Sequence, residues 1–147
     1  MKKIFFLLSA WIVTNTAFAQ SGNAENNSSA GKKTYFSTNS TKICYYNKKT
    51  KKYDKCVTYK VSTVFEVNAG RTVFTHTTSD QSSTYYIQNS RYNQQYKYYS
   101  YAVVSDVGNK YTFLVSKRGK YITILKGTGD DSYNMYFTVN RKWKKRN

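Results

Sequence analysis

The sequence predicts an all-β protein, an antiparallel up-and-down meander of about eight strands. Three observations carry this prediction. Tyrosine occurs 16 times beside many Thr, Val, Phe and Ser residues, which suit a pleated, half-buried surface. Proline is absent, so no candidate strand loses a backbone donor. Apolar and polar residues alternate between short turns, and such turns connect antiparallel rather than parallel strands.

An export signal precedes the predicted domain. Two lysines follow Met1, residues 4–13 form an apolar run, and Ala17-Phe18-Ala19 places small residues where a signal peptidase reads. The run is about half of the roughly 20 residues that a membrane span needs. We therefore expect removal of residues 1–19, which takes two lysines and lowers the net charge from +17 to +15. The product should be periplasmic or extracellular, with no transmembrane segment.

One domain is expected after the signal. Residues 20–31 are mostly Ser, Asn, Ala and Gly, which bury too little apolar area to offset the entropy of ordering, so they are interpreted as a flexible leader. The β domain should span residues 32–140, followed by a basic C-terminal tail at 141–147. A chain of this length suits a single domain, and we expect a monomer.

The expected strands follow in order. The opening arms are residues 42–47 and 53–67, with 34–38 as a candidate for one more strand. Residues 72–78 should fold back on the second arm and place Phe65 opposite Phe74, since a correct register puts apolar residues from both arms on one face. Pairing across the later turns and into the last strand gives one inner row, namely Tyr85, Val104, Phe113, Val115, Ile122, Ile124 and Phe137.

A meander this long leaves exposed edges unless it closes or folds over. We expect a small closed barrel of the lipocalin or calycin kind, with a β-sandwich as the alternative. An eight-stranded barrel is either filled by side chains or holds one small ligand, and the bulky aromatic inner row favours the filled form.

Cys44 and Cys56 are the only cysteines. In an exported protein a lone pair predicts a disulfide rather than a metal or redox site. Folding residues 42–47 back on 53–58 places the two cysteines directly opposite each other, within reach of a bond.

Catalytic groups are scarce. His76 is the only histidine, and no serine has the flanking glycines of a nucleophile elbow. The few carboxylates form no pair suited to glycoside hydrolysis, and residues 127–131 are interpreted as a turn rather than a calcium loop. We therefore expect no catalytic residues, no cofactor and no metal site, with a hydrolase as the third-ranked alternative.

Positive charge is concentrated in two stretches with interleaved aromatic residues, a pattern that suits anionic polymers. The expected partners are anionic polysaccharide, lipopolysaccharide or extracellular DNA. Solubility and protection of a sheet edge explain the same charges equally well. The candidate binding residues are Lys48, Lys49, Lys51 and Lys52 in a hairpin tip, and Arg141, Lys142, Trp143, Lys144, Lys145 and Arg146 in the tail.

The alternative function is a lipocalin-like carrier of a small apolar ligand. Its pocket would be lined by Tyr85, Val104, Phe113, Ile124 and Phe137.

Three segments resemble small exported β-rich proteins of Bacteroidota. The resemblance implies an exported β protein and assigns no activity or functional residue. The segments are Phe74-Thr75-His76-Thr77-Thr78, Ser83-Thr84-Tyr85-Tyr86-Ile87 and Val103-Val104-Ser105-Asp106-Val107-Gly108-Asn109-Lys110-Tyr111.

Overall fold

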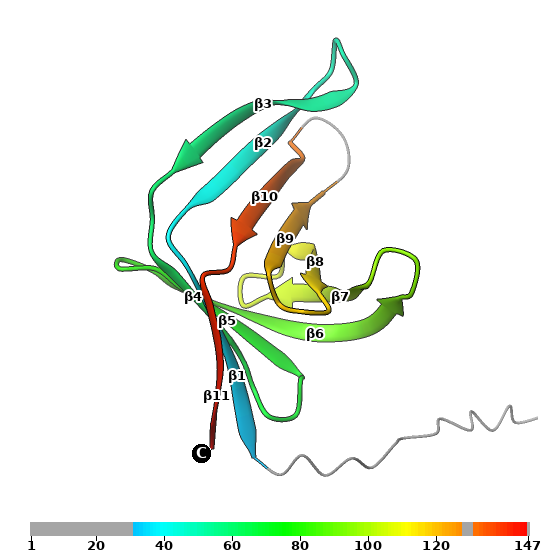
Figure 1. The fold of residues 1–147 in the computed structure, drawn as a ribbon. Helices are drawn as coiled ribbons and strands as arrows, with labels where there is room; N and C mark the ends of the chain where they lie inside the picture. The colour runs from blue at the N-terminus through cyan, green and yellow to red at the C-terminus, as the bar shows by residue number, and fades with distance from the viewer. Residues whose placement is uncertain (1–30, 128–130, 147) are drawn as a thin grey trace, which may run out of the picture.

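The computed structural model describes residues 31–127 and 131–146, which form one antiparallel sheet of eleven strands (Figure 1). The predicted signal peptide and most of the predicted leader lie outside the described residues. The sheet order is β11-β1-β4-β5-β6-β7-β8-β9-β10-β2-β3. The strands are β1 (Lys32–Thr38), β2 (Thr41–Asn47), β3 (Lys52–Tyr59), β4 (Thr63–Val67), β5 (Val73–Thr77), β6 (Ser82–Asn93), β7 (Tyr98–Ser105), β8 (Lys110–Ser116), β9 (Tyr121–Lys126), β10 (Tyr133–Thr138) and β11 (Arg141–Arg146).

The all-β class and the antiparallel meander are confirmed, whereas the closed barrel of about eight strands is wrong. The sheet curls strongly but does not close into an uninterrupted barrel, and β11 and β3 lie at the two ends of its order (Figure 1). The count is higher because the candidate strand at 34–38 forms as β1, the predicted arm at 53–67 is divided into β3 and β4, and the predicted tail forms β11.

At one bend the backbone N–H of Asn140 donates to the carbonyl of Ser37 at 2.8 Å. The Asn140 amide also donates to Asn39 Oδ1. The chain changes its strand partners at this bend. Before the bend β1 lies between β11 and β4, and after it β2 lies between β10 and β3.

Turn chemistry decides which predicted registers hold. Phe113 pairs with Ile124 as predicted. Phe65 pairs with His76 rather than Phe74, because Asn68 Oδ1 accepts bonds from the N–H groups of Thr72 and Val73 and closes the turn two residues later than expected.

The register between β7 and β8 also differs from the prediction, which placed Val104 on the inner face. The N–H of Ser105 donates to the carbonyl of Asn109 at 2.8 Å, which closes the turn at this pair. As a result Tyr101 lies opposite Phe113, and Val103 rather than Val104 points into the core.

Aromatic side chains fill the concave face of the curled sheet. The Phe65 and Phe137 ring centroids are 4.9 Å apart, and those of Phe74 and Phe113 are 5.2 Å apart. These pairs join strands that are not neighbours in the sheet, so side-chain packing holds the curl together. The buried cluster comprises Phe36, Phe65, Val67, Phe74, Tyr85, Val103, Phe113, Val115, Ile122, Ile124 and Phe137.

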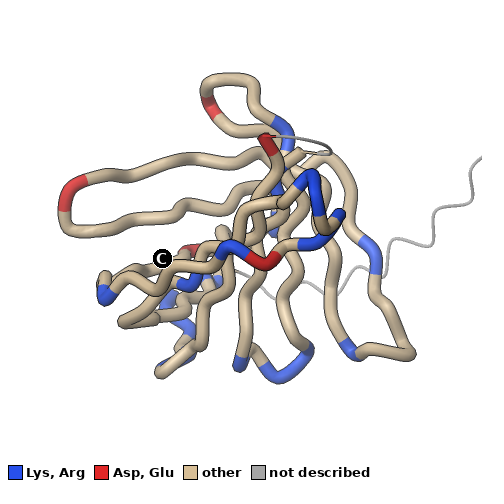
Figure 2. Tube along the Cα trace, turned by 90° about the horizontal axis from the view of Figure 1, so that it is seen from above, with Lys and Arg blue, Asp and Glu red and all other residues tan. Residues whose placement is uncertain are grey.

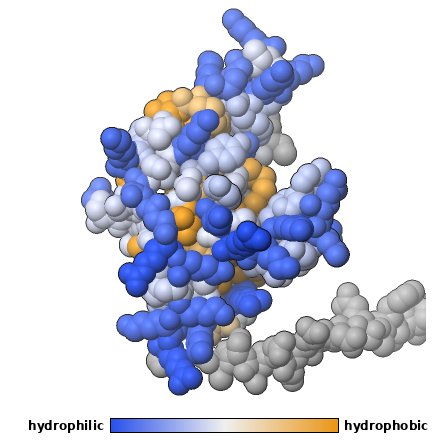
Figure 3. All heavy atoms as spheres, in the orientation of Figure 1, coloured by the Kyte–Doolittle hydropathy of each residue, from blue (hydrophilic) through white to orange (hydrophobic). Residues whose placement is uncertain are grey.

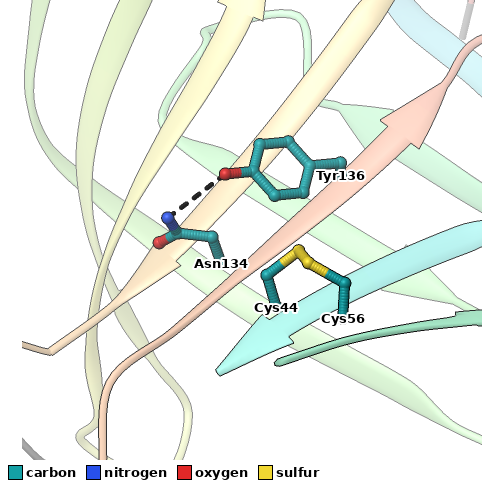
Figure 4. Close-up of a disulfide and its surroundings, with 4 residues drawn as sticks. All are labelled: Cys44, Cys56, Asn134 and Tyr136. Carbon is teal, nitrogen blue, oxygen red and sulfur yellow. Dashed lines mark hydrogen bonds between the residues drawn. A yellow bond between two sulfur atoms is a disulfide. The ribbon is translucent and has the colours of Figure 1, made fainter. Parts of the chain in front are cut away.

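The disulfide between Cys44 and Cys56 is confirmed, and it joins opposite residues of β2 and β3 (Figure 4). Asn134 and Tyr136 of β10 lie beside it, with the Asn134 amide donating to the Tyr136 hydroxyl at 3.3 Å. Strand β3 ends the sheet, pairs with β2 alone and has all eight of its residues exposed, so the bond fastens an edge strand to its one neighbour.

Replacing Cys44 and Cys56 together with serine should lower the free energy of unfolding by about 2 kcal/mol, because the unfolded chain is no longer constrained. Urea denaturation of the oxidised protein and the variant measures this difference. The variant should be insensitive to added reductant. Equal midpoints for the two proteins would contradict a stabilising role for the bond.

Candidate functional site

The two predicted basic stretches lie at opposite ends of the molecule. Lys32, at the start of β1, pairs with Arg146, whereas residues 48–51 follow the far end of β2. Figure 1 shows the β2–β3 tip at the top and the C-terminus at the bottom, and Figure 3 shows hydrophilic side chains over both ends. The two stretches therefore do not form one binding surface.

The predicted basic tail is an ordered strand. Residues 141–146 form β11, which pairs along β1. Trp143 stacks on Tyr35 with ring centroids 5.3 Å apart, and the Arg141 guanidinium lies 5.4 Å from the Trp143 ring centroid. Since side chains alternate along a strand, Arg141, Trp143 and Lys145 face one side and leave Lys142 and Lys144 on the other.

Lys142 and Lys144 line a cleft of about 200 Å³ at the β1–β11 end of the sheet, hereafter the basic cleft. Its residues come from β1, β4, β7, β8, β11 and the turns that follow β4 and β8. Figure 2 shows that basic positions outnumber acidic ones and that several lie beside the C-terminus. No Asp or Glu lines the cleft, whose five cationic residues are Lys32, Arg71, Lys117, Lys142 and Lys144.

Arg71 is held in the cleft by a turn with an unusual backbone. Its φ is +52°, in the left-handed region that side chains other than glycine rarely adopt. Its N–H donates to the carbonyl of Asn68 at 3.0 Å. Burial raises the pKa of Tyr101, and the nearby Arg71 charge offsets part of this rise, so the two groups share one electrostatic environment.

Lys142 lies against an aromatic ring of the core and near other cations of the cleft. Its ammonium lies 5.4 Å from the centroid of the Phe36 ring. Partial burial lowers the pKa of Lys142, and the positive charges of Lys144 and Arg71 lower it further. The described residues supply none of the five cleft cations with a carboxylate partner. Like charges thus face one another across the cleft, where a bound anion would relieve their repulsion.

Gly119 makes room for Lys142. A Cβ atom at Gly119 would lie 2.7 Å from Cδ of Lys142 and 2.9 Å from Cε1 of Phe36, and the φ of Gly119 is +69°. Close approach and left-handed backbone therefore both require glycine here.

Gly119→Ala should destabilise the protein by about 1–2 kcal/mol, since it adds backbone strain and displaces Lys142 and Phe36. Gly108→Ala is the matched control, because Gly108 has a φ of +84° but a Cβ atom added there would meet no neighbour within 4 Å. Thermal unfolding should show the larger loss for Gly119→Ala. Equal losses would mean that the contact with Lys142 contributes nothing.

The hairpin tip differs electrostatically from the basic cleft. Its lysines Lys48, Lys49, Lys51 and Lys52 are exposed around Asp54. The Asp54 carboxylate accepts a bond from the Thr50 hydroxyl at 2.6 Å and another from the Asn47 amide, and these bonds lower its pKa. A carboxylate within the tip reduces its attraction for anions.

The opposite end of the core holds a second cavity of about 180 Å³, which includes His76. The His76 ring stacks on Phe65 at 4.6 Å, and burial lowers the pKa of His76 to about 4. No Asp or Glu is among the residues that line this cavity, so its lining supplies no carboxylate to orient the His76 ring. Among the described residues, no group of three or more His, Cys, Asp and Glu is placed to hold a metal ion.

Comparison with protein-family models, with curated proteins and with solved structures finds no match to this chain. Within residues 31–127 and 131–146, no helix is long and apolar enough to cross a membrane.

Sequence reasoning found two cleft cations, Lys142 and Lys144, and missed Lys32, Arg71 and Lys117. The missed residues lie far apart along the chain and outside the two densest basic stretches, and only the curl of the sheet brings them together. The dipeptide Gly70-Arg71 could have pointed to Arg71, because it lies in a turn between two apolar strands.

Proposed function

We propose that this is an exported, non-enzymatic protein that binds anionic polymers or envelope surfaces, and that it does so through the basic cleft. One observation carries the proposal: five cations from four separate segments line one cleft that contains no carboxylate. The disulfide is compatible with an oxidising compartment outside the cytoplasm.

Electrostatics explains why an anion would enter. Cations near a protein surface interact more strongly with a bound charge than they would in bulk water. Release of counterions from a charged polymer adds a salt-dependent contribution. Tyr99 and Tyr101, which also line the cleft, place aromatic rings next to this charge.

The carrier alternative has less support. Phe113 and Phe137 are buried in the core cluster, whereas Tyr85 and Ile124 also line the cavity of about 180 Å³ beside His76. Val104 lies outside the buried cluster. Apart from that small cavity, the packed core leaves little room for an apolar ligand among these residues.

Retention on immobilised heparin and DNA, eluted with salt, tests the proposal with two charge-matched variants. The cleft variant carries Arg71→Gly, Lys142→Gln and Lys144→Gln, whereas the hairpin variant carries Lys49→Gln, Lys51→Gln and Lys52→Gln. Both lose three positive charges. Arg71→Gly should leave folding intact, because glycine adopts the left-handed backbone without strain.

The cleft variant should elute at much lower salt than the hairpin variant. On duplex DNA, the slope of log affinity against log salt should fall by roughly 0.9 for each phosphate contact that the cleft variant loses. Equal elution of the two variants would show that retention follows net charge alone. A larger loss for the hairpin variant would relocate the site to the β2–β3 tip.

A further inference from the structure

The size of the basic cleft limits what it can hold. Its volume of about 200 Å³ lies below the roughly 300–1,000 Å³ that is typical of ligand pockets. A length of polymer would not fit within this volume, whereas one compact charged unit would. Polymer binding through this cleft therefore points to recognition of an end group or a protruding substituent.

The distribution of charge favours a group with more than one negative charge. Lys32 enters from β1, Arg71 from the turn after β4, Lys117 from the turn after β8, and Lys142 and Lys144 from β11. A phosphate monoester carries about two charges at neutral pH and has three acceptor oxygens, which suits donors that approach from several directions. A carboxylate or a sulfate ester carries only one negative charge and would compensate fewer of the five cations.

One wall of the cleft is aromatic. The rings of Tyr99 and Tyr101 lie 6.4 Å apart with an interplanar angle of 28°. Tyr101 is fixed by an edge-to-face contact with Phe74 at 5.1 Å. A small ring attached to the phosphate would have an amphipathic surface to contact beside the cations.

We propose that the basic cleft recognises a phosphate monoester carried on a sugar, as the end group or substituent of a glycan. This inference rests on the proposed function and specifies the ligand of the same site. The phosphate would contact the Arg71, Lys142 and Lys144 side, and the sugar ring would lie toward Tyr99 and Tyr101.

Isothermal titration with small probes tests the inference directly. The probes are D-glucose 6-phosphate, D-glucose 6-sulfate, inorganic phosphate and adenosine 5′-monophosphate. Glucose 6-phosphate should bind most tightly, and the sulfate about tenfold more weakly because it lacks the second charge. A sulfate within about twofold of the phosphate would overturn the proposal, as would inorganic phosphate binding as tightly as the sugar phosphate. Tighter binding of the nucleotide would overturn it in favour of nucleic-acid ends.

Dependence on pH gives a second readout. The second pKa of a phosphate monoester is about 6, so affinity for glucose 6-phosphate should rise between pH 5 and pH 7. Affinity for the sulfate should stay flat, because the lining residues include no histidine, aspartate or glutamate that would titrate in this range. Parallel pH profiles for the two probes would contradict recognition of the dianion.

Two variants separate the two halves of the site. Arg71→Gly should weaken both phosphates about tenfold or more. Tyr99→Thr should weaken glucose 6-phosphate to the level of inorganic phosphate while leaving inorganic phosphate unchanged. An unchanged preference for the sugar phosphate in Tyr99→Thr would rule out the aromatic wall.

Two further arms distinguish the source of the phosphosugar. Vesicles containing lipid A present phosphate monoesters on a sugar headgroup, and a soluble phosphorylated mannan presents them on a polysaccharide. Binding to either, displaced by glucose 6-phosphate, supports the inference and identifies the source. Equal binding to phosphatidylglycerol vesicles of the same charge, which carry only phosphodiesters, would contradict it. If heparin retention depends on the cleft but no phosphosugar binds, the proposed function stands and this inference fails.

Discussion

Replacing Phe65 with alanine is expected to lower the free energy of unfolding by about 3–5 kcal/mol, the largest effect of a single substitution that we predict. Phe65 is fully buried. Its ring stacks on His76 at 4.6 Å and meets Phe137 edge-on at 4.9 Å. Because Phe137 lies on β10 and Phe65 on β4, the substitution leaves a cavity where distant parts of the curled sheet meet.

Urea denaturation followed by far-ultraviolet circular dichroism measures the loss. Tyr121→Ala serves as the control, since Tyr121 is an aromatic strand residue that is 58% exposed. It should change stability by less than about 1 kcal/mol. A loss below about 1 kcal/mol for Phe65→Ala would mean that the aromatic cluster does not hold the curl together.

Acidification should destabilise the protein through His76. Burial lowers the pKa of His76 to about 4 in the folded protein, from 6.5 in the unfolded chain. The folded state excludes a proton that the unfolded state binds, so stability is fully present above pH 6.5 and is lost as pH falls toward 4. Between pH 7 and pH 4.5 we expect a loss of about 2.5 kcal/mol.

Parallel urea titrations of the protein and of His76→Gln at these two pH values isolate the contribution. Asp54 does not interfere, because its pKa lies below 3.8 and its contribution is lost only at still lower pH. The variant should show a much smaller change with pH. A pH dependence as steep in His76→Gln as in the unsubstituted protein would assign the acid sensitivity to other groups.

Much of the fold could be predicted because local patterns and turn residues act over short distances. The Cys44–Cys56 pairing and the Phe113–Ile124 register follow from alternation and a short turn. Phe65 was misplaced because the Asn68 side chain forms bonds that alternation cannot reveal. The change of strand partners between β1 and β2 was missed because this bend depends on Asn140, which is distant in sequence and meets Ser37 only in the folded chain.

The candidate site was less predictable than the fold. The sequence shows where basic residues are concentrated along the chain. This concentration led to the prediction of binding residues in the hairpin tip and at residues 141–146. The basic cleft instead combines charges from outside these stretches, such as Lys32, Arg71 and Lys117, with one face of β11. Strand alternation divides the C-terminal cations between two faces, so a dense stretch places only some of its charges in the cleft.

Nuclear magnetic resonance of the ¹⁵N-labelled protein, titrated with a short heparin fragment at constant salt, tests the location of the site most directly. Backbone amide shifts should change first around Asn68 and Arg71, at Ser116 and Lys117, and at Lys142, which line the basic cleft. Residues 48–52 should shift only at higher concentration. Early and saturable shifts confined to residues 48–52, with the cleft unaffected, would contradict the proposed site.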